Sequence, residues 1–449
     1  MSASSMREPA PVADRVPQEP GSASRGALLE IFWVALRLGL TSFGGPIAHL
    51  AYFQEEYVRR RRWLGDRAFA DIVALCQFLP GPASSQVGIA IGMMRAGVPG
   101  GVAAWLGFTL PSALAMALFA LYFREQSLSG AGWLRGLLIV AVAVVAAAVW
   151  EMAVKLTPDR TRASIALAAA IVTLAAPWAG TQVAVILLGG ISGWLLLRDA
   201  AAAGEREPGA SGSAPGAGAL AAGAGAPGEG APGESIPAAA GPGGALSLSR
   251  RGARLAWALF FALLLGLPLV RKVYPAGWLA VLDTFYRAGS LVFGGGHVVL
   301  PLLAREVVGA GWITEEQFLA GYGAAQAVPG PLFTFAAYAG AAMQGWPFAA
   351  LALIAVFAPS FLLVAGALPY WERIRRRKEV RAALWGVNAA VVGILLAALY
   401  DPIFTKAIHT PADFSLALGG FGLLKLWRLP SWCLVLLMAA AGMALQALG

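Results

Sequence analysis

Two short stretches interrupt the first apolar part of the chain: Phe43-Gly44-Gly45-Pro46, and then Gln77-Phe78-Leu79-Pro80-Gly81-Pro82. The same order returns about 250 positions later, as Phe293-Gly294-Gly295-Gly296 and then Gln326-Ala327-Val328-Pro329-Gly330-Pro331. Proline cannot continue a helix and glycine weakens one, so each copy predicts two helices that break inside apolar sequence. Breaks at matched places in two halves of a chain are typical of transporters built from repeats.

The composition predicts an all-α polytopic membrane protein. Hydrophobic residues make up 58% of the chain and charged residues 13%, whereas soluble domains average about 25% charged. Long uninterrupted apolar runs indicate transmembrane helices rather than barrel strands. The net charge of +9 does not indicate nucleic-acid binding, because the arginines concentrate in short loops between apolar runs. We therefore expect a multi-pass protein of the inner (plasma) membrane, whose partner is the lipid bilayer and not nucleic acid.

The apolar segments divide the chain into two repeats of six segments, joined by one extra helix. A linker rich in Gly, Ala and Pro separates the repeats, and it has too few large apolar residues to bury a core. The predicted parts are a disordered cytoplasmic tail at 1–26, a first membrane repeat at 27–198, the linker at 199–250, a connecting transmembrane helix at 251–276 and a second membrane repeat at 277–449.

Charge in the short loops predicts that the two repeats have inverted topology. The loop after the first segment of copy one holds Arg59, Arg60, Arg61, Arg62 and Arg67, whereas its counterpart holds only Arg305. After the third segment the bias reverses, and the arginine-rich loop lies at 373–381 in copy two. An excess of Lys and Arg marks the cytoplasmic side, so equivalent loops lie on opposite sides. Both loops are cytoplasmic only if the first two segments of each repeat are re-entrant hairpins; full spans are the alternative.

Each break also begins a new half-helix, and this predicts an anion site. The first backbone N–H groups of a helix are unpaired and carry the positive end of its dipole. Four such helix starts that converge from two inverted copies would bind an anion through backbone donors. The candidate backbone positions are Gly44, Gly45, Gly81, Gly294, Gly295 and Gly330.

Several side chains near the breaks are further candidates for binding the substrate. Arg37 and Arg287 lie in apolar segments, where an arginine usually faces a partner or a cavity, and the guanidinium fork suits a tetrahedral oxyanion. The alternative is a structural ion pair with Glu56 or Glu306, the two carboxylates that are also candidates for proton coupling. Neutral donors are Gln77, Ser84, Ser85, Gln326 and Thr334. Copy one has more polar residues after its second break, so we expect the two copies to contribute unequally to substrate binding.

No metal site, cofactor or enzymatic site is expected. His49, His297 and His409 are not spaced as a metal cluster, and Cys76 and Cys433 are single residues in apolar segments. For His49 and His297 the simpler interpretation is a packed, hydrogen-bonded histidine. The chain has no phosphate-binding loop that would indicate ATP drive, and it lacks the common hydrolase motifs.

With these motifs in this order, the chain resembles the chromate ion transporter family in its long two-domain form, over residues 27–449. The resemblance implies an inner-membrane carrier that exports chromate, for which sulfate competes, and that confers chromate resistance. The alternative is a proton-coupled transporter of sulfate or another oxyanion. A homodimer is left open.

Overall fold

The computed structural model describes residues 24–43, 45–123, 132–176, 181–203, 250–292, 303–304, 306–371 and 377–448. Within these ranges the elements are helices joined by short connections, and there is no strand. The prediction of an all-α fold is therefore confirmed. The expected tail lies almost wholly, and the expected linker largely, outside the described residues.

Six of the described helices are long and apolar enough to cross a membrane, which takes about 20 residues. They are α4 (Ala83–Phe123), α5 (Gly132–Leu156), α7 (Thr181–Ala203), α9 (Arg250–Val273), α14 (Trp346–Ala367) and α16 (Lys378–Ala398), which continues through η4 (Leu399–Phe404) and α17 (Thr405–Ala407). Large apolar side chains such as Leu187, Leu265 and Ile354 are more than half exposed on these helices. Such surfaces suit contact with lipid, as expected of a multi-pass membrane protein.

The first predicted segment folds back on itself. It comprises α1 (Arg25–Thr41), a break at Ser42 and Phe43, and then α2 (Gly45–Phe53) with the π-helical turn η1 (Gln54–Arg60). Arg61 follows directly, and its Nη1 lies 3.0 Å from Oε1 of Glu30 in the second turn of α1. The end of this segment therefore lies beside the beginning of α1. This geometry agrees with a re-entrant hairpin and not with a full span.

The second predicted segment is a hairpin of the same kind. It begins with α3 (Asp66–Phe78), breaks, and continues into α4. The Arg95 guanidinium in α4 lies 3.4 Å from Glu30 and 4.1 Å from the ring centre of Trp63. A kink at Ala96 and Gly97 then reverses the direction of α4, because the backbone there is not helical. Both hairpins thus return to the end of the molecule that carries the arginine-rich loop.

In the second repeat the described helices follow the same order as those of the first. α10 (Gly277–Leu291) matches α1, and α12 (Glu315–Ala327) matches α3; η2 (Leu332–Thr334) and α13 (Phe335–Gln344) match the first part of α4. The kink before α14 has φ +78° at Gly345, against +63° at the equivalent Gly97. The sequence repeat is therefore also a structural repeat. The predicted inversion concerns how the second repeat is oriented in the membrane relative to the first.

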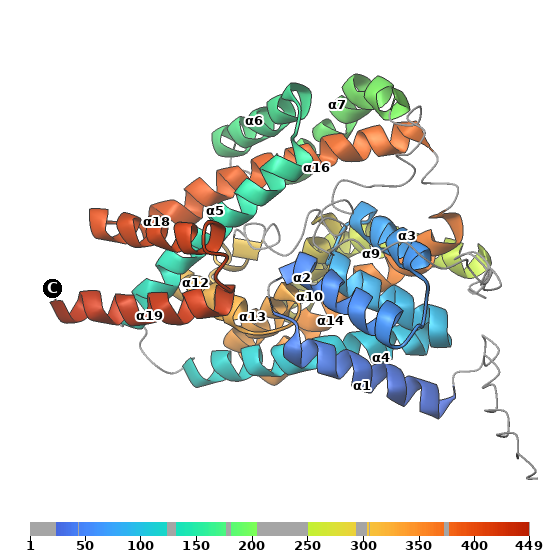
Figure 1. Cartoon of the computed structure of the whole chain (residues 1–449), viewed down its shortest axis with the longest axis horizontal. Coiled ribbons are helices and arrows are strands. Elements are labelled where there is room, and N and C mark those ends of the chain that lie inside the picture. The colour runs from blue at the N-terminus through green and yellow to red at the C-terminus, as the bar shows by residue number, and fades with distance from the viewer. Residues whose placement is uncertain are drawn as a thin grey trace, which may run out of the picture.

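Two helices are exchanged between the repeats (Figure 1). α5 of repeat one packs against α18 (Pro411–Lys425) and α19 (Ser431–Leu448) of repeat two, while α16 of repeat two packs against α6 (Arg160–Ala175) and α7 of repeat one. The Arg135 guanidinium of α5 lies 2.8 Å from the buried carboxylate of Asp413 in α18. Neither repeat can therefore complete its own packing without the other.

Glycines allow these exchanged helices to approach closely. Gly189 and Gly193 of α7 face Gly386 of α16, and Gly132 and Gly136 of α5 face Gly442 of α19. A Cβ atom at any of these positions would collide with backbone atoms of the facing glycines or, at Gly136, of Met438. Small residues spaced four apart are the usual means of close helix packing where lipid removes the hydrophobic driving force.

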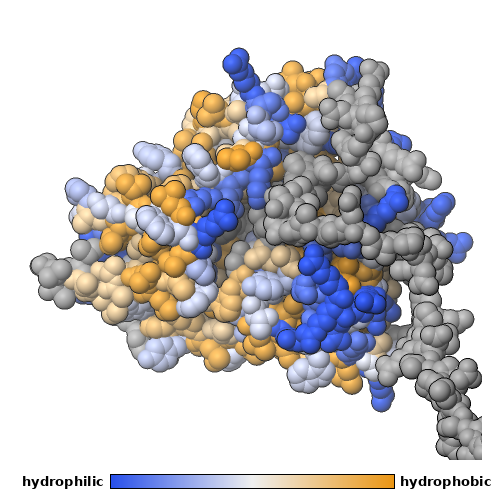
Figure 2. Space-filling view, in the orientation of Figure 1, coloured by the Kyte–Doolittle hydropathy of each residue, from blue (hydrophilic) through white to orange (hydrophobic). Residues whose placement is uncertain are grey.

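A dense hydrophilic patch lies at one end of this helical body (Figure 2). Figure 2 shows hydrophilic residues where α1, α3 and α4 meet, and mainly hydrophobic residues over α18 and α19. Arg59, Arg60 and Arg61 belong to the hydrophilic end, and each pairs with a glutamate of its own repeat.

Leucine in place of Gly386 should destabilise the protein by about 3 kcal/mol, because overpacking here displaces backbone rather than a flexible side chain. Gly419→Leu is the matched control, since nothing lies within 4 Å of a Cβ at that position of α18. Thermal denaturation in detergent, followed by gel filtration, compares the two. Equal melting temperatures for both variants would contradict the proposed close contact.

Candidate functional site

The breaks of the two repeats cross near the middle of the molecule. The backbone N–H of Gly81 donates to the carbonyl of Val292 at 2.6 Å, and the N–H of Gly330 donates to the carbonyl of Ser42 at 3.0 Å. Gly81 and Gly330 are equivalent residues, as are Ser42 and Val292. Each hydrogen bond therefore ties the second break of one repeat to the first break of the other.

Glycine is needed at both crossings for its conformation and for its size. The φ angles are +116° at Gly81 and +100° at Gly330, values that L side chains rarely adopt. A Cβ on Gly330 would lie 2.8 Å from Oγ of Ser112, and one on Gly81 would lie 3.1 Å from Oγ of Ser360. Each glycine thus fits under the serine of the other repeat.

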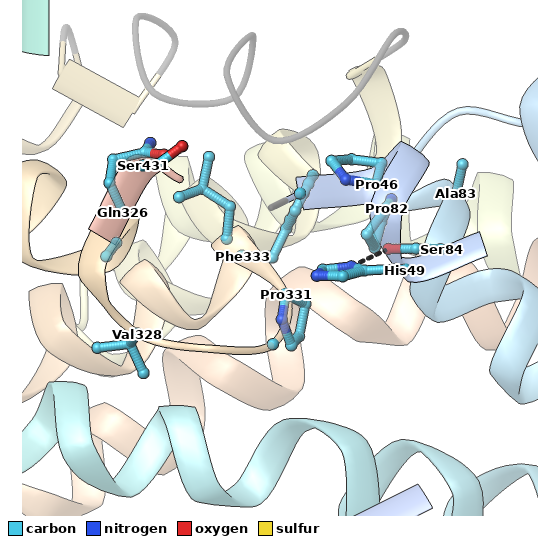
Figure 3. A pocket seen from close by; sticks show the side chains of 14 residues that line it. Pro46, His49, Pro82, Ala83, Ser84, Gln326, Val328, Pro331, Phe333 and Ser431 are labelled. Atoms are coloured by element: carbon cyan, nitrogen blue, oxygen red, sulfur yellow. Dashed lines mark hydrogen bonds between the residues drawn. The ribbon is translucent and has the colours of Figure 1, made fainter. Parts of the chain in front are cut away.

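A cavity of about 50 Å³ lies beside this crossing (Figure 3). This volume has room for a few waters. Residues of both repeats line it: Gly45, Pro46, His49, Pro82, Ala83, Ser84, Ala325, Gln326, Val328, Gly330, Pro331, Leu332, Phe333 and Ser431.

Three half-helices begin at the cavity wall. α2 begins at Gly45, α4 at Ala83 and η2 at Leu332, and all three residues line the cavity. Their first N–H groups supply donors and the positive ends of helix dipoles, which favour an anion. The fourth predicted start follows the break in 294–296, which lies outside the described residues.

Two side chains bring unpaired nitrogens to the cavity from opposite repeats (Figure 3). His49 of α2 is 1% exposed; its Nδ1 lies 3.2 Å from Oγ of Ser84, and its Nε2 has no hydrogen-bond partner among the described residues. Gln326 of α12 likewise has a buried Nε2 that makes no close hydrogen bond among the described residues, and its amide lies beside the Tyr322 hydroxyl. Buried polar atoms are normally paired, so both are suited to a ligand.

Some predicted site residues meet here. Gly45, Ser84, Gln326 and Gly330 line the cavity. The neighbouring Ser85 is buried, and its hydroxyl lacks a hydrogen-bond partner among the described residues, whereas Thr334 at the equivalent position donates to the Pro331 carbonyl at 2.8 Å. The two copies therefore differ at this position.

The other predicted side chains lie away from the cavity. Arg37 and Gln77 are exposed on their helices. The Arg287 guanidinium lies 2.8 Å from Asp283 and 3.3 Å from Glu306, while Glu56 lies 2.7 Å from Arg61. Both glutamates are thus engaged in ion pairs, and Arg287 makes the ion pair with Glu306 that the sequence predicts as the alternative to substrate binding, together with one to Asp283. The predicted positions Gly44, Gly294 and Gly295 lie outside the described residues.

Two residues of the site were missed from the sequence. His49 was interpreted as a packed histidine, yet it follows the Gly45 break by one helical turn, so it faces the same space as the break. Outside the cavity, the ion pair between Asp283 and Arg287 was not predicted either. Ser431, at the start of α19, had no signal in the sequence.

The sequence pattern of the chromate transporter family matches residues 29–194 and 279–443. The chain belongs to this family. It is 29% identical to a chromate transport protein of Pseudomonas aeruginosa, covering 92% of this chain and 91% of the relative. It is 26% identical to a chromate transport protein of Cupriavidus metallidurans, over 85% and 86%. A probable chromate transport protein of Synechococcus elongatus is 25% identical over 91% and 93%. No solved structure matches the chain.

Alanine substitutions should separate the roles of the two hydroxyls that follow the second breaks. Ser85→Ala removes a hydroxyl without a described partner, so we expect weaker substrate binding at nearly unchanged stability. Thr334→Ala removes a hydrogen bond to the break, so it should lower stability by about 1 kcal/mol at nearly unchanged KM. Transport assays and thermal denaturation of both variants test this; equal loss of transport in both would show the asymmetry to be wrong.

Proposed function

We propose that this protein exports chromate, a divalent tetrahedral oxyanion, from the cytoplasm across the inner membrane and thereby confers chromate resistance. The observation that carries the proposal is the buried cavity at the crossing of the breaks, with three half-helix starts and two unpaired side-chain nitrogens at its wall. Membership in the chromate transporter family supports the choice of substrate. Sulfate, of the same charge and shape, is the expected competitor.

The donors in this cavity suit a ligand that must also be released. Backbone N–H groups, the Ser84 hydroxyl and the Gln326 amide carry no full charge, and the described arginines are not among the residues that line it. Neutral donors bind an anion more weakly than a guanidinium pair does. The anion is therefore held by several modest contacts and leaves when the cavity opens.

Alternating access follows from inverted repeats that share this cavity. In the proposed topology the first repeat starts from the cytoplasmic side and the second from the opposite side, as their arginine-rich loops indicate. A cavity between two such repeats opens to either side when one packs differently against the other. The hydrogen bonds of Gly81 and Gly330 join the two repeats beside this cavity.

The membrane potential is sufficient to drive export. Moving one charge across 100 mV is worth about 2.3 kcal/mol, so a dianion leaving a negative-inside cell gains about 4.6 kcal/mol. This free energy supports a gradient of about three decades. Proton-coupled transport of sulfate or another oxyanion through Glu56 or Glu306 remains the second candidate, and both of these carboxylates lie in ion pairs away from the cavity.

Everted membrane vesicles with a positive-inside potential should accumulate radiolabelled chromate. We expect excess sulfate to compete and an uncoupler to abolish the uptake. Vesicles that lack the protein control for leak, and a second transporter in the same vesicles confirms that they are energised. Absence of chromate uptake in competent vesicles, or uptake that follows an imposed pH gradient instead of the potential, would favour the second candidate.

A further inference from the structure

We propose that His49 is the proton-binding residue of the anion cavity and takes up one proton when a dianion binds. The proposal rests on the function proposed above and adds that anion binding and protonation are linked at one side chain. Nothing in the sequence motifs assigns a role to His49, because its counterpart in copy two is not a histidine but Val299. The inference comes from where the ring lies.

The His49 imidazole is enclosed and points into the cavity. It is 1% exposed, its edge packs on the Phe108 ring with centroids 5.3 Å apart, and Nδ1 is engaged with Ser84. The carbonyl of Ser42, which accepts the hydrogen bond of Gly330, is also a hydrogen-bond acceptor beside the ring, although Nε2 makes no close hydrogen bond to it. Nε2 is left as the polar atom that is free to meet a ligand, and Figure 3 shows the ring between Ser84 and Pro331.

No other ionisable group occurs among the described residues that line the cavity. His49 contacts Ser84 and Phe108 of α4, and the cavity wall that it shares also presents Gln326 from α12 and Phe333 from η2; all four side chains are neutral. The glutamates of the first hairpin pair with arginines at its arginine-rich end, and Arg37 is exposed on α1, so none of these charges lines the cavity. The charge of a bound dianion can therefore be compensated from the described cavity wall only at His49.

The hydrogen bond to Ser84 determines what the ring offers to the anion. A neutral imidazole has one donor and one acceptor, so if Nδ1 donates to Ser84, Nε2 presents a lone pair that repels an oxyanion. A protonated ring donates to Ser84 and to the anion at once. An adjacent negative charge in a cavity poor in water favours this protonated form.

Two consequences follow for transport. Between the pH at which the empty site loses its proton and the higher pH at which the occupied site loses it, each anion bound takes up one proton, and affinity falls by about tenfold per pH unit. If the proton leaves with the anion, one net negative charge crosses the membrane for each dianion instead of two. Loss of the proton on the outer side then weakens binding and promotes release.

Proton uptake can be measured directly on the purified full-length protein in lipid nanodiscs. Sulfate is the probe, because it remains a dianion from about pH 5.5 to about pH 8.5, the range in which a histidine titrates. Calorimetric titration in buffers of different ionisation enthalpy gives the protons taken up per anion. We expect close to one proton per sulfate for the wild type in the upper half of this range.

His49→Gln keeps a side-chain N–H and a partner for Ser84 but cannot be protonated. This variant should bind sulfate with an affinity that no longer depends on pH and should take up no proton. His409→Gln is the matched control, because His409 is exposed at the start of α18 and should behave as the wild type does. Ser84→Ala, as a second variant, should retain proton uptake with several-fold weaker binding.

The outcomes separate this inference from the proposed function. Sulfate binding that is independent of pH in the wild type would overturn the role of His49 and leave anion transport intact. Proton uptake that persists in His49→Gln but disappears in His297→Gln would also overturn it. Failure of the wild type to bind either sulfate or chromate at any pH would contradict the proposed function itself.

Discussion

The structure depends on two equivalent main-chain hydrogen bonds, from Gly81 to Val292 and from Gly330 to Ser42. A broken helix inside a membrane leaves backbone groups unpaired, and each such group costs several kcal/mol in hydrocarbon. Here a backbone N–H at the second break of each repeat donates to a carbonyl that is freed at the first break of the other repeat. The breaks are therefore stable only as a crossed pair. The same geometry explains the glycines, since any side chain at Gly330 would occupy the space of Ser112.

The crossed breaks and the exchanged helices both couple the movement of one repeat to that of the other. Because α5 packs on α18 and α19, and α16 on α6 and α7, neither repeat moves without displacing part of the other. The cavity lies between the two repeats, bordered by Pro82 and Ser84 of one and by Gln326 and Pro331 of the other. A substrate bound there contacts both repeats at once, so its binding biases how they pack. This is the kind of differential contact that a transport cycle requires.

Sequence alone predicted the all-α fold and the breaks, because Gly and Pro at matched positions in apolar sequence have one simple explanation. It also predicted that Gly45, Ser84, Gln326 and Gly330 belong together, since all four border those breaks. It did not predict the exchanged helices, because glycines such as Gly189 and Gly386 show close packing without showing the partner. It left Arg287 open between the anion and an ion pair with a glutamate, and it did not weigh Asp283, one turn away on the same helix. Several groups in the sequence are chemically suited to an anion site. Tertiary packing decides which of them come together, and a single sequence does not show that packing.

The central claim, that the crossed breaks create the transport site, is tested most directly by Gly330→Ala measured against Gly311→Ala. Both glycines have positive φ, but a Cβ at Gly311 has nothing within 4 Å, whereas one at Gly330 meets Ser112. Backbone strain of about 1 kcal/mol is common to both variants, so their difference isolates the crossing. The account predicts that Gly311→Ala retains chromate uptake in everted vesicles and that Gly330→Ala loses it at comparable levels of folded protein. Equal uptake by the two variants would contradict the account.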